Sequence, residues 1–549
     1  MKKKILSMIL AGAFVIGTLA ACQTTTPEQP AGSGTTQGGA AQGGAAQGGA
    51  AQGGAAQGGT TVQPDPPAAG VLGRGINVVT QNEPPSVAPG QHNAVAGSYM
   101  NAMHYSALFR LDAATMAPIP NLVASYVAVS DTVFEFTLHE GVQFHDGTIL
   151  TAHDVIASWE FVRQFPFGSA SRESIVHFEA LDDLTVRVDT EIPNALFFTD
   201  LAHQSNHIMP RHLIESGNDF ETNVVGTGPF VFQEWRSGDS IHSTAFENYF
   251  DEDRAARVEY VTWRIVPEAT TRTIMMETNE ADYNVYVGFS DIQRLQDASN
   301  VVMETYTGTS HSVLLMNNDL PMFQDYRVRR ALGMAVNQES VILVGMEGHA
   351  IPARGNVPNI FPGFDPDLGA YEFDPQGALA LLAEAGVDPS TISFSMIASN
   401  EERRRMGEVM QAYFAAIGVT ATIDMNDLAT TLERTQQGNY ETGFGGFSSA
   451  TFLGYVRGVL HSSQAIPGGS NRSNFRNDEM DEWITLGLAT VDASQRPAIY
   501  QEIARIANTY TPHIPTHMAM NARAWNSNLV VPELCPTGAL NLNVMFWAE

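Results

Sequence analysis

Hydrophobic and polar residues alternate along short segments of this chain, as they do in half-buried β-strands. Residues 133–138 are Val-Phe-Glu-Phe-Thr-Leu, and the His-Asp-Gly sequence at 145–147 is typical of a turn. Thr151 lies three residues before Asp154, as in a capping box, so the pattern predicts a helix that begins there and continues to Val162.

Elsewhere apolar residues recur at helical spacing. The stripe that follows Asp325 consists of Val328, Ala331, Leu332, Ala335 and Val336. A second helix is predicted to begin at Asp374-Pro375 and to end at Gly386, and a third ends at Gly418. The stripe of the third consists of Met406, Val409, Met410, Tyr413, Phe414 and Ile417. We interpret these stripes as core rather than cofactor contacts, and together with the strands they indicate an α/β fold.

The N-terminus has the pattern of an export signal. Three lysines precede a short apolar stretch at 5–19, which ends in Leu-Ala-Ala-Cys at 19–22. The stretch is too short for a comfortable membrane span and is typical of a signal peptide. We therefore predict a lipoprotein signal peptide at 1–21 and a lipid on Cys22. The alternative is an ordinary secretory signal followed by a chance cysteine.

Residues 22–70 differ in composition from the rest. Ala-Ala-Gln-Gly-Gly occurs four times in tandem between 40 and 59, and no large apolar side chain occurs between 23 and 61. Such a segment cannot offset the entropy of folding, so we predict a disordered tether with a reach of roughly 40 Å.

Length and charge limit what the remainder can be. The chain has 549 residues and a formal net charge of −30, so the body after residue 70 should form two or three subdomains. The negative charge opposes binding to nucleic acid and to anionic lipid, which leaves the predicted lipid as the membrane contact. The two cysteines, Cys22 and Cys535, predict no disulfide framework.

The familiar catalytic signatures are missing from the sequence. Lysine occurs only at positions 2, 3 and 4, which excludes a Walker A phosphate loop, a kinase-type lysine and a Schiff-base lysine in the mature chain. The chain also has no Gly-x-Ser-x-Gly, His-Glu-x-x-His or Gly-x-Gly-x-x-Gly motif. We predict neither an enzyme nor a cofactor.

Histidines gather in two places. The spacing of His203 and His207 allows two imidazoles on one helix face, as a metal site requires, and His513 and His517 show the same spacing. The first stretch also contains Pro210 and no carboxylate at ligand spacing, so we favour surface or core histidines and predict no metal site.

Three blocks of sequence resemble one known family. The first comprises Leu-Phe-Arg-Leu-Asp at 108–112, Pro-Asn-Leu-Val-Ala-Ser-Tyr at 120–126, Glu-Gly-Val-Gln-Phe-His-Asp-Gly-Thr at 140–148 and Leu-Thr-Ala-His-Asp-Val at 150–155. The second comprises Val-Gly-Thr-Gly-Pro-Phe at 225–230, Glu-Trp at 234–235 and Gly-Asp-Ser at 238–240; the third comprises 325–332 and Ala-Val-Asn at 335–337. In this order they resemble the family 5 extracellular solute-binding proteins, the oligopeptide-, dipeptide- and nickel-binding group of ABC importers.

Each block also has a structural interpretation. Gly226 and Gly228 suit a tight entry into a strand, residues 144–148 suit a strand–turn–helix corner, and Arg329 and Arg330 are expected on the rim of a helix. The blocks therefore identify the scaffold rather than the binding site.

The resemblance implies an α/β, two-lobe, periplasmic-binding-protein-like fold (type II, large cluster) with an extra subdomain inserted in lobe I. The expected divisions are lobe I at 71–110, 225–285 and 515–549, the inserted subdomain at 111–224, and lobe II at 286–514. The chain would cross between the lobes near 282–287 and 511–516, and closure of the lobes would bury the ligand.

The resemblance also implies which residues contact the ligand. Their counterparts here are Asn93, Tyr283, Tyr286, Phe447, Ser448, Ser449, Thr451 and His517. Aromatic residues with a polar tip suit a binding cleft, although any one of them could simply pack.

One loop departs from the family pattern. Peptide-binding members carry Gly-Trp-x-x-Asp there, and the Asp pairs with the α-ammonium of the peptide. This chain has Gly446-Phe447-Ser448-Ser449-Ala450, so alanine stands where the acid is expected. Either another acid, such as Glu83, holds the amine, or the ligand has no amine to hold. We favour the second, with neutral hydrogen bonds from Ser448, Ser449 and Thr451 to a peptide main chain or a sugar-like solute.

The sequence thus predicts a transport receptor for peptides or similar small polar solutes. It would be a monomer, anchored by lipid to the outer face of the cytoplasmic membrane, with a membrane permease as its partner. The alternatives are a receptor for nickel or a metal chelate on the same scaffold and, third, an exported enzyme.

Overall fold

The computed structural model describes residues 74–548 except 93, 166–173, 362–364, 366–367, 369, 468, 533–534 and 536. The predicted signal peptide, the lipidation site Cys22, the tether and the predicted ligand residue Asn93 lie outside the described residues. No helix of the described part of the chain is long and apolar enough to cross a membrane.

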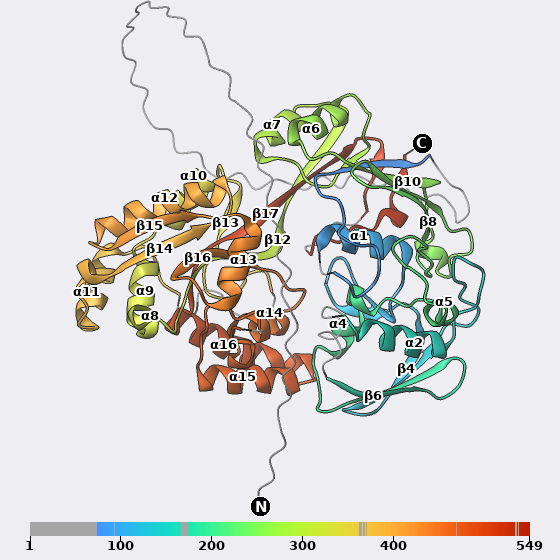
Figure 1. Cartoon of the computed structure of the whole chain (residues 1–549), viewed down its shortest axis with the longest axis horizontal. Helices are drawn as coiled ribbons and strands as arrows, with labels where there is room; N and C mark the ends of the chain where they lie inside the picture. The colour runs from blue at the N-terminus through green and yellow to red at the C-terminus, as the bar shows by residue number, and fades with distance from the viewer. Residues whose placement is uncertain are drawn as a thin grey trace, which may run out of the picture. The chain divides into compact units, whose positions relative to one another are not determined.

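A mixed sheet of eleven strands, counted over the described residues, runs through the molecule (Figure 1). Its order is β15 (Thr420–Met425), β14 (Ser393–Ala398), β16 (Thr442–Phe447), β12 (Val301–Met316), β17 (His513–Asn526), β11 (Tyr283–Asn284), β1 (Ile76–Thr80), β10 (Tyr260–Ile265), β9 (Ser240–Ala245) and β8 (Phe230–Arg236), with β13 (Ala350–Pro352) paired to β17.

The antiparallel pair β12 and β17 joins two separate cores. The pairing extends from Val301 opposite Asn526 to Leu315 opposite His513. At one end, Val301 packs in a core with Val79 of β1. At the other end, the strands contribute to a core that contains Met396 of β14. The fold is therefore two-lobed, with the sheet continuous across both lobes.

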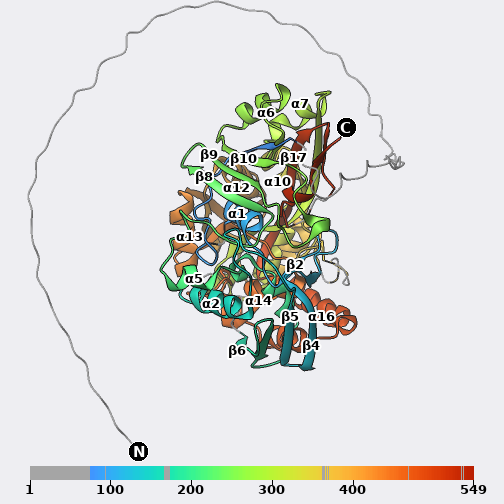
Figure 2. The ribbon, with the colours of Figure 1, turned by 90° about the vertical axis from the view of Figure 1, so that its right-hand side faces the viewer.

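The lobe that contains β1 carries three helices near its strands, α1 (Val95–His104), α6 (Ala269–Glu277) and α7 (Ile292–Gln296), and a small ribbon of β18 (Leu529–Val530) and β19 (Phe546–Trp547). Next to it lies a second layer built on a four-stranded antiparallel sheet (Figure 2). The elements of that layer are β2 (Phe109–Leu111), β3 (Pro118–Pro120), β4 (Val123–Ser130), β5 (Val133–Leu138), β6 (Ile175–Ala180), β7 (Thr185–Thr190), α2 (Ala152–Val162), α4 (Phe197–Leu201) and α5 (Arg211–Glu215). Its core surrounds the fully buried Phe136 and Trp159.

The other lobe is largely helical. Its helices are α8 (Pro321–Gln324), α9 (Tyr326–Met334), α10 (Gln338–Gly345), α11 (Pro375–Glu384), α12 (Glu401–Ala416), α13 (Leu428–Gln437), α14 (Phe452–Leu460), α15 (Asp478–Ala489) and α16 (Arg496–Tyr510). One core packs α9 to α12 on β14 and β16, and a second core joins α14, α15 and α16.

The local predictions of the first strand and helix are confirmed. Strand β5 occupies 133–138, and Gly147 in the turn that follows has a φ of +83°, a left-handed conformation that favours glycine. Helix α2 begins where the capping pattern placed it, because the Asp154 carboxylate accepts a hydrogen bond of 2.8 Å from the Thr151 N–H.

The three helices of the second half are also confirmed. Asp325 caps α9 by accepting the Arg327 N–H at 2.9 Å, and the five apolar residues of the predicted stripe are all buried. Helices α11 and α12 end before Gly386 and Gly418, whose φ values are +72° and +86°.

The interpretation of Gly226 and Gly228 is confirmed. A β-carbon on Gly226 would lie 2.2 Å from the His104 carbonyl oxygen, and one on Gly228 would lie 2.4 Å from the Met103 carbonyl oxygen. Only glycine allows this close approach of backbone, just before β8 begins at Phe230.

The prediction that Arg329 lies on a helix rim is wrong. Its side chain is buried, and its guanidinium donates to the carbonyl oxygens of Phe323 at 2.6 Å, Tyr510 at 2.6 Å and Thr511 at 2.8 Å. The guanidinium has a fan of donors that fits several carbonyls at once, which is why a charged residue can occupy this buried place. Arg330 is half-buried and donates to the Asn508 carbonyl at 2.8 Å.

The lobe boundaries and the two crossings stay predictions. Val287 at the end of the first expected crossing, and Ile292 just after it, pack with Val79 and Met275 in the core beside β1. Nearby, the buried Arg272 donates to the carbonyls of Val266 at 2.7 Å and of Tyr286 at 3.1 Å, which ties this segment to α6.

Candidate functional site: a cleft between the lobes

A cavity of about 680 Å³ lies where the two lobes face each other. One wall comes from α1, β2 and the segment at 199–207; the opposite wall comes from the loop at 448–451 at the start of α14. In Figure 1, α1 and α4 lie to one side of this region and α14 to the other. Residues 537–541 of the C-terminal segment and Thr309 of β12 also line it. Segments far apart in sequence thus form one cavity.

The loop at 448–451 places hydroxyl groups at the cavity. It connects the end of β16 to the first turn of α14, and Thr451 caps that helix by accepting the Gly454 N–H at 3.1 Å. The Ser449 hydroxyl accepts the Thr451 N–H at 3.3 Å. Ser448, Ser449 and Thr451, all predicted from sequence, line the cavity, as does Ala450. Their contact with a ligand stays a prediction.

The other predicted ligand residues lie elsewhere. Phe447 is half-buried and packs edge-on against Tyr455, with ring centroids 6.4 Å apart. Tyr283 is fully buried in β11 and stacks on Trp525 at 6.0 Å, because its side chain points into the core. Tyr286 is 41% exposed.

His517 is likewise held in the sheet. It is buried in β17, and its Nδ1 lies 3.2 Å from the Thr516 hydroxyl oxygen. Burial lowers the pKa of His517 to about 4, helped by the positive charge of Arg403, so the imidazole is neutral at physiological pH. Neither it nor Phe447, Tyr283 or Tyr286 is among the described residues that line the cavity.

Glu83 is not placed to hold a ligand amine. Its carboxylate accepts the Trp235 indole N–H at 2.8 Å and the Gly238 N–H at 3.0 Å. The hydrogen bond from Gly238 is the main reason that the pKa of Glu83 is lowered. This residue, too, is absent from the described lining of the cavity.

Sequence reasoning missed the charged residues at the cavity. Arg110, Asp200 and Arg254 line it, and each has an interaction partner within the protein. Asp200 is the one acid among the described lining residues. Arg110 belongs to the first family block, but nothing in the sequence indicates that these three positions meet, since tertiary structure alone brings them together.

The histidine pair at 203 and 207 does not form a helix face. These two residues flank a short 3₁₀ helix, Gln204–Asn206, and the His203 ring accepts the Ser205 N–H at 3.2 Å. Within the described residues, no three His, Cys, Asp or Glu side chains come together in a way that could hold a metal ion.

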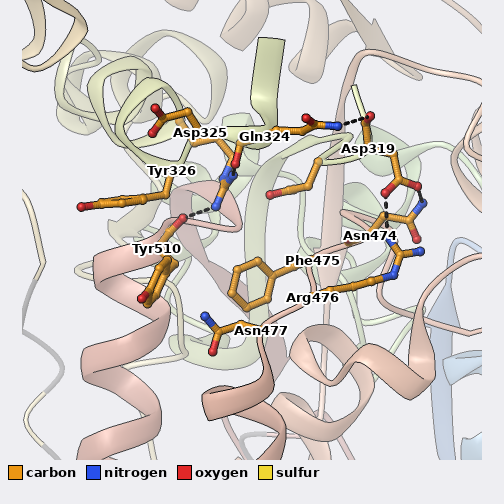
Figure 3. Close-up of a pocket in the computed structure, with 11 residues that line it drawn as sticks. Asp319, Gln324, Asp325, Tyr326, Asn474, Phe475, Arg476, Asn477 and Tyr510 are labelled. Carbon is orange, nitrogen blue, oxygen red and sulfur yellow. Dashed lines mark hydrogen bonds and ion pairs between the residues drawn. The ribbon is translucent and has the colours of Figure 1, made fainter. Parts of the chain in front are cut away.

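A smaller pocket of about 330 Å³ lies on the helical lobe, away from the cleft (Figure 3). Its polar groups bind one another: Asp319 accepts from Arg476 at 2.6 Å and from the Asn474 amide at 2.8 Å. Tyr326 and Tyr510 stand at its edge with ring centroids 5.2 Å apart. We interpret it as a surface crevice closed by its own ion pair and amides.

A two-lobed α/β fold with a ligand-sized cavity between the lobes defines a solute-binding protein of the periplasmic type. The comparison with known families agrees: residues 117–456 match the family described as "Bacterial extracellular solute-binding proteins, family 5 Middle". The match covers more than half of the chain, and the chain belongs to this family. The resemblance and the fold class predicted from sequence are confirmed.

Individual relatives are more distant. The chain is 26% identical over 446 residues to the dipeptide-binding protein of Escherichia coli strain K12. The aligned region covers 74% of this chain and 82% of the relative. HbpA2 from Haemophilus parasuis superimposes with a TM-score of 0.77 at 23% identity, covering 87% of this chain and 100% of the other. DppA from Helicobacter pylori, solved in complex with the peptide STSA, gives a TM-score of 0.76 at 22% identity, with coverage of 87% and 99%. Because both sequence identities are below 25%, these two structures support the fold alone.

Proposed function

We propose that this protein is the extracytoplasmic receptor of an ABC importer, and that it captures peptides or similar small polar solutes and delivers them to a membrane permease. The observation that carries the proposal is the cavity of about 680 Å³ lined from both lobes. Small-molecule sites typically enclose about 300–1,000 Å³. The names of the Escherichia coli and Helicobacter relatives, one a dipeptide-binding protein and one bound to a peptide, support peptides as the ligand class.

Closure of the lobes is the proposed mechanism of capture. Binding proteins of this architecture bend at the segments that cross between lobes, and ligand contacts on both lobes stabilise the closed form. The expected second crossing contains Thr511, which has a φ of +45° after the end of α16. The loop at 448–451 and α1 would approach each other on closure and remove the ligand from water.

The lobe that carries α14 would hold the ligand without an acid. Ala450 stands at the position where peptide-binding relatives are expected to carry Asp, and Ser448, Ser449 and Thr451 are among the residues that line the cavity. Glu83 is engaged by Trp235. We therefore propose neutral hydrogen bonds to a peptide main chain or to a sugar-like solute, and no ion pair to a free amine.

Mass spectrometry of the ligand retained by the purified protein tests the class. We expect peptides or small polar solutes in the denatured extract and compaction in solution scattering when they are added back, without their consumption. Retention of nickel or a metal chelate in place of an organic solute would favour the alternative receptor. Steady breakdown of the added peptides would favour an enzyme and overturn the proposal.

The contribution of the hydroxyls is tested by the double variant Ser448→Ala/Ser449→Ala. Each neutral hydrogen bond contributes about 0.5–1.5 kcal/mol, so affinity for the identified ligand should fall by about tenfold or more. Ser216→Ala is the matched control, since Ser216 is exposed at the end of α5 and donates to the Leu213 carbonyl at 3.0 Å. Equal affinity in all three proteins would contradict the proposed role of the loop.

The location of the protein is proposed from its N-terminus. The Leu-Ala-Ala-Cys sequence at 19–22 supports lipid attachment at Cys22 and retention at the outer face of the cytoplasmic membrane. One monomer would then present its cleft to solutes at the end of the tether at 22–70.

A further inference from the structure

Three residues on one wall of the cavity each carry a buried polar atom that has no hydrogen-bond partner among the described residues. Tyr105 is 2% exposed, His207 is 8% exposed, and both line the cavity together with Gln204. The Tyr105 hydroxyl, the Gln204 Oε1 and the His207 Nδ1 are buried, and none has a hydrogen-bond partner among the described residues. Buried polar groups in proteins are nearly always paired, and a ligand group bound at this wall would supply the missing partners.

The positions of the two rings are fixed by backbone contacts. Tyr105 follows α1 and its N–H donates to the Asn101 carbonyl at 2.9 Å, while a β-carbon on Gly226 would lie 2.5 Å from the Tyr105 ring. The Ile208 N–H donates to the Ser106 carbonyl at 2.9 Å, which ties the neighbours of the two rings together. The Tyr105 and His207 rings are stacked, with centroids 6.2 Å apart and an angle of 16° between their planes.

The three groups are uncharged at physiological pH. Burial raises the pKa of Tyr105, so its hydroxyl keeps its proton and can both donate and accept. Burial also lowers the pKa of His207 to about 3, and the nearby imidazoles of His203 and His92 act in the same direction. A neutral imidazole has one ring nitrogen that donates and one that accepts, while Gln204 Oε1 only accepts.

The charged groups nearby already have partners. Arg110, Asp200 and Arg254 line the same cavity, and each interacts with another part of the protein. Glu221, whose charge acts on Tyr105, accepts hydrogen bonds from the Ser86 hydroxyl and from the Val87 N–H. The three groups of the wall are themselves neutral, so a charged ligand group placed against them would lose hydration without gaining a counter-ion from them.

We propose that Tyr105, Gln204 and His207 form a ligand subsite for an uncharged group that both donates and accepts hydrogen bonds, a carboxamide or a hydroxyl of the bound solute. The inference rests on the proposed function and deepens it, since it defines one chemical group of the solute. A carboxamide would give its N–H to Gln204 and take the Tyr105 O–H on its carbonyl; a sugar hydroxyl would make the same pair of bonds with one oxygen.

The test uses the full chain purified in mild detergent. It is incubated with tripeptides that contain two alanines and one variable residue, which is Gln, Glu, Met or Lys and is placed in turn at each of the three positions. A parallel sample is incubated with neutral disaccharides. Mass spectrometry identifies the molecules that the protein retains. The wild type should retain the Gln peptide over its Glu and Lys counterparts by about tenfold at one position, or retain disaccharides. Gln204→Glu should reverse the peptide preference towards Lys at that position, or lower disaccharide retention about tenfold.

Two further variants separate recognition from folding. Gln233→Glu is the matched control, since Gln233 is exposed on β8 and donates to the Thr244 hydroxyl at 3.0 Å; it should behave as the wild type. Tyr105→Phe keeps the stacked ring and removes the hydroxyl, and should weaken binding of the preferred solute by about tenfold.

The outcomes distinguish the two proposals. Retention of peptides or disaccharides with the same preference in wild type, Gln204→Glu and Tyr105→Phe would refute the subsite and leave the receptor function standing. Retention of neither class by the wild type would overturn the receptor function and this inference with it. A reversal in Gln204→Glu supports both, because a purely structural role of Gln204 would not redirect binding to a cationic side chain.

Discussion

Substitution of Arg329 by Met should destabilise the helical lobe strongly. The guanidinium donates to the carbonyls of Phe323, Gln324, Tyr510 and Thr511 over distances of 2.6–3.0 Å. Tyr510 is the last residue of α16, so the arginine satisfies carbonyls that the end of a helix leaves without partners, and its positive charge lies at the negative end of the helix dipole. Burial lowers the pKa of Arg329 to about 10, which still leaves it charged at neutral pH.

The magnitude follows from what the substitution leaves behind. Methionine fills most of the space of the arginine stem, so the main loss is electrostatic. The hydrogen bonds to Phe323 and Thr511 are buried, and each carbonyl left unpaired costs about 1–3 kcal/mol. With the weaker loss at the two partly buried carbonyls, the free energy of unfolding should fall by about 3–5 kcal/mol.

The control lies two residues away on the same helix. Arg327 is 30% exposed in its side chain and pairs with Asp325 at 2.6 Å, so Arg327→Met should cost about 0–1 kcal/mol while the cap from Asp325 to the Arg327 N–H remains. Urea unfolding followed by circular dichroism measures both variants. A loss of less than 1 kcal/mol in Arg329→Met, or equal losses in the two variants, would refute the argument that Arg329 is a structural cap.

Four other outcomes are expected. Radiolabelled fatty acid should enter the wild type but not Cys22→Ser, and equal labelling would reject the lipid anchor. An amine-reactive dye should label no internal site of the mature chain, because lysine occurs only at positions 2, 3 and 4; peptide mapping of the labelled protein checks this. A binding peptide and its N-acetylated form should bind with similar affinity, since Ala450 replaces the expected acid, and a hundredfold loss on acetylation in calorimetry would reject the neutral mode. Burial lowers the pKa of His104 from 6.5 to about 3, so below pH 6.5 the unfolded chain takes up a proton that the folded chain does not. The free energy of unfolding should therefore fall as the pH drops from 6.5 towards 3. His104→Gln should make this fall less steep when the free energy is measured by urea titration at each pH.

The fold was predictable because its signals are local or repeated. The capping pair at 151 and 154 and the apolar stripe of α9 are each contained within a few turns of chain, and both are confirmed. The three family blocks gave the two-lobe arrangement. Arg329 was misplaced because two of its four carbonyl partners, at Tyr510 and Thr511, lie about 180 residues further on, and no periodicity within its own helix reveals them.

The part of the candidate site that the sequence predicted is the loop that could be aligned with the resembling family. The serines at 448 and 449, which the family resemblance implied, line the cavity from the loop between β16 and α14. Tyr105 and His207 meet through a contact between the end of α1 and the segment after α4, which no local pattern encodes. The cluster of histidines at 203 and 207 was the available signal, and its spacing suggested metal ligands on a helix. In the structure the His207 ring is uncharged, stacks on Tyr105 and lies beside the cavity. The segment therefore contributes buried, neutral hydrogen-bonding groups to the candidate site instead of metal ligands. Neutral hydrogen-bonding groups are thus present on this wall and on the acid-free loop across the cavity. Such groups on both lobes would favour one class of solute, and ligand contacts with both lobes are the condition under which binding stabilises closure.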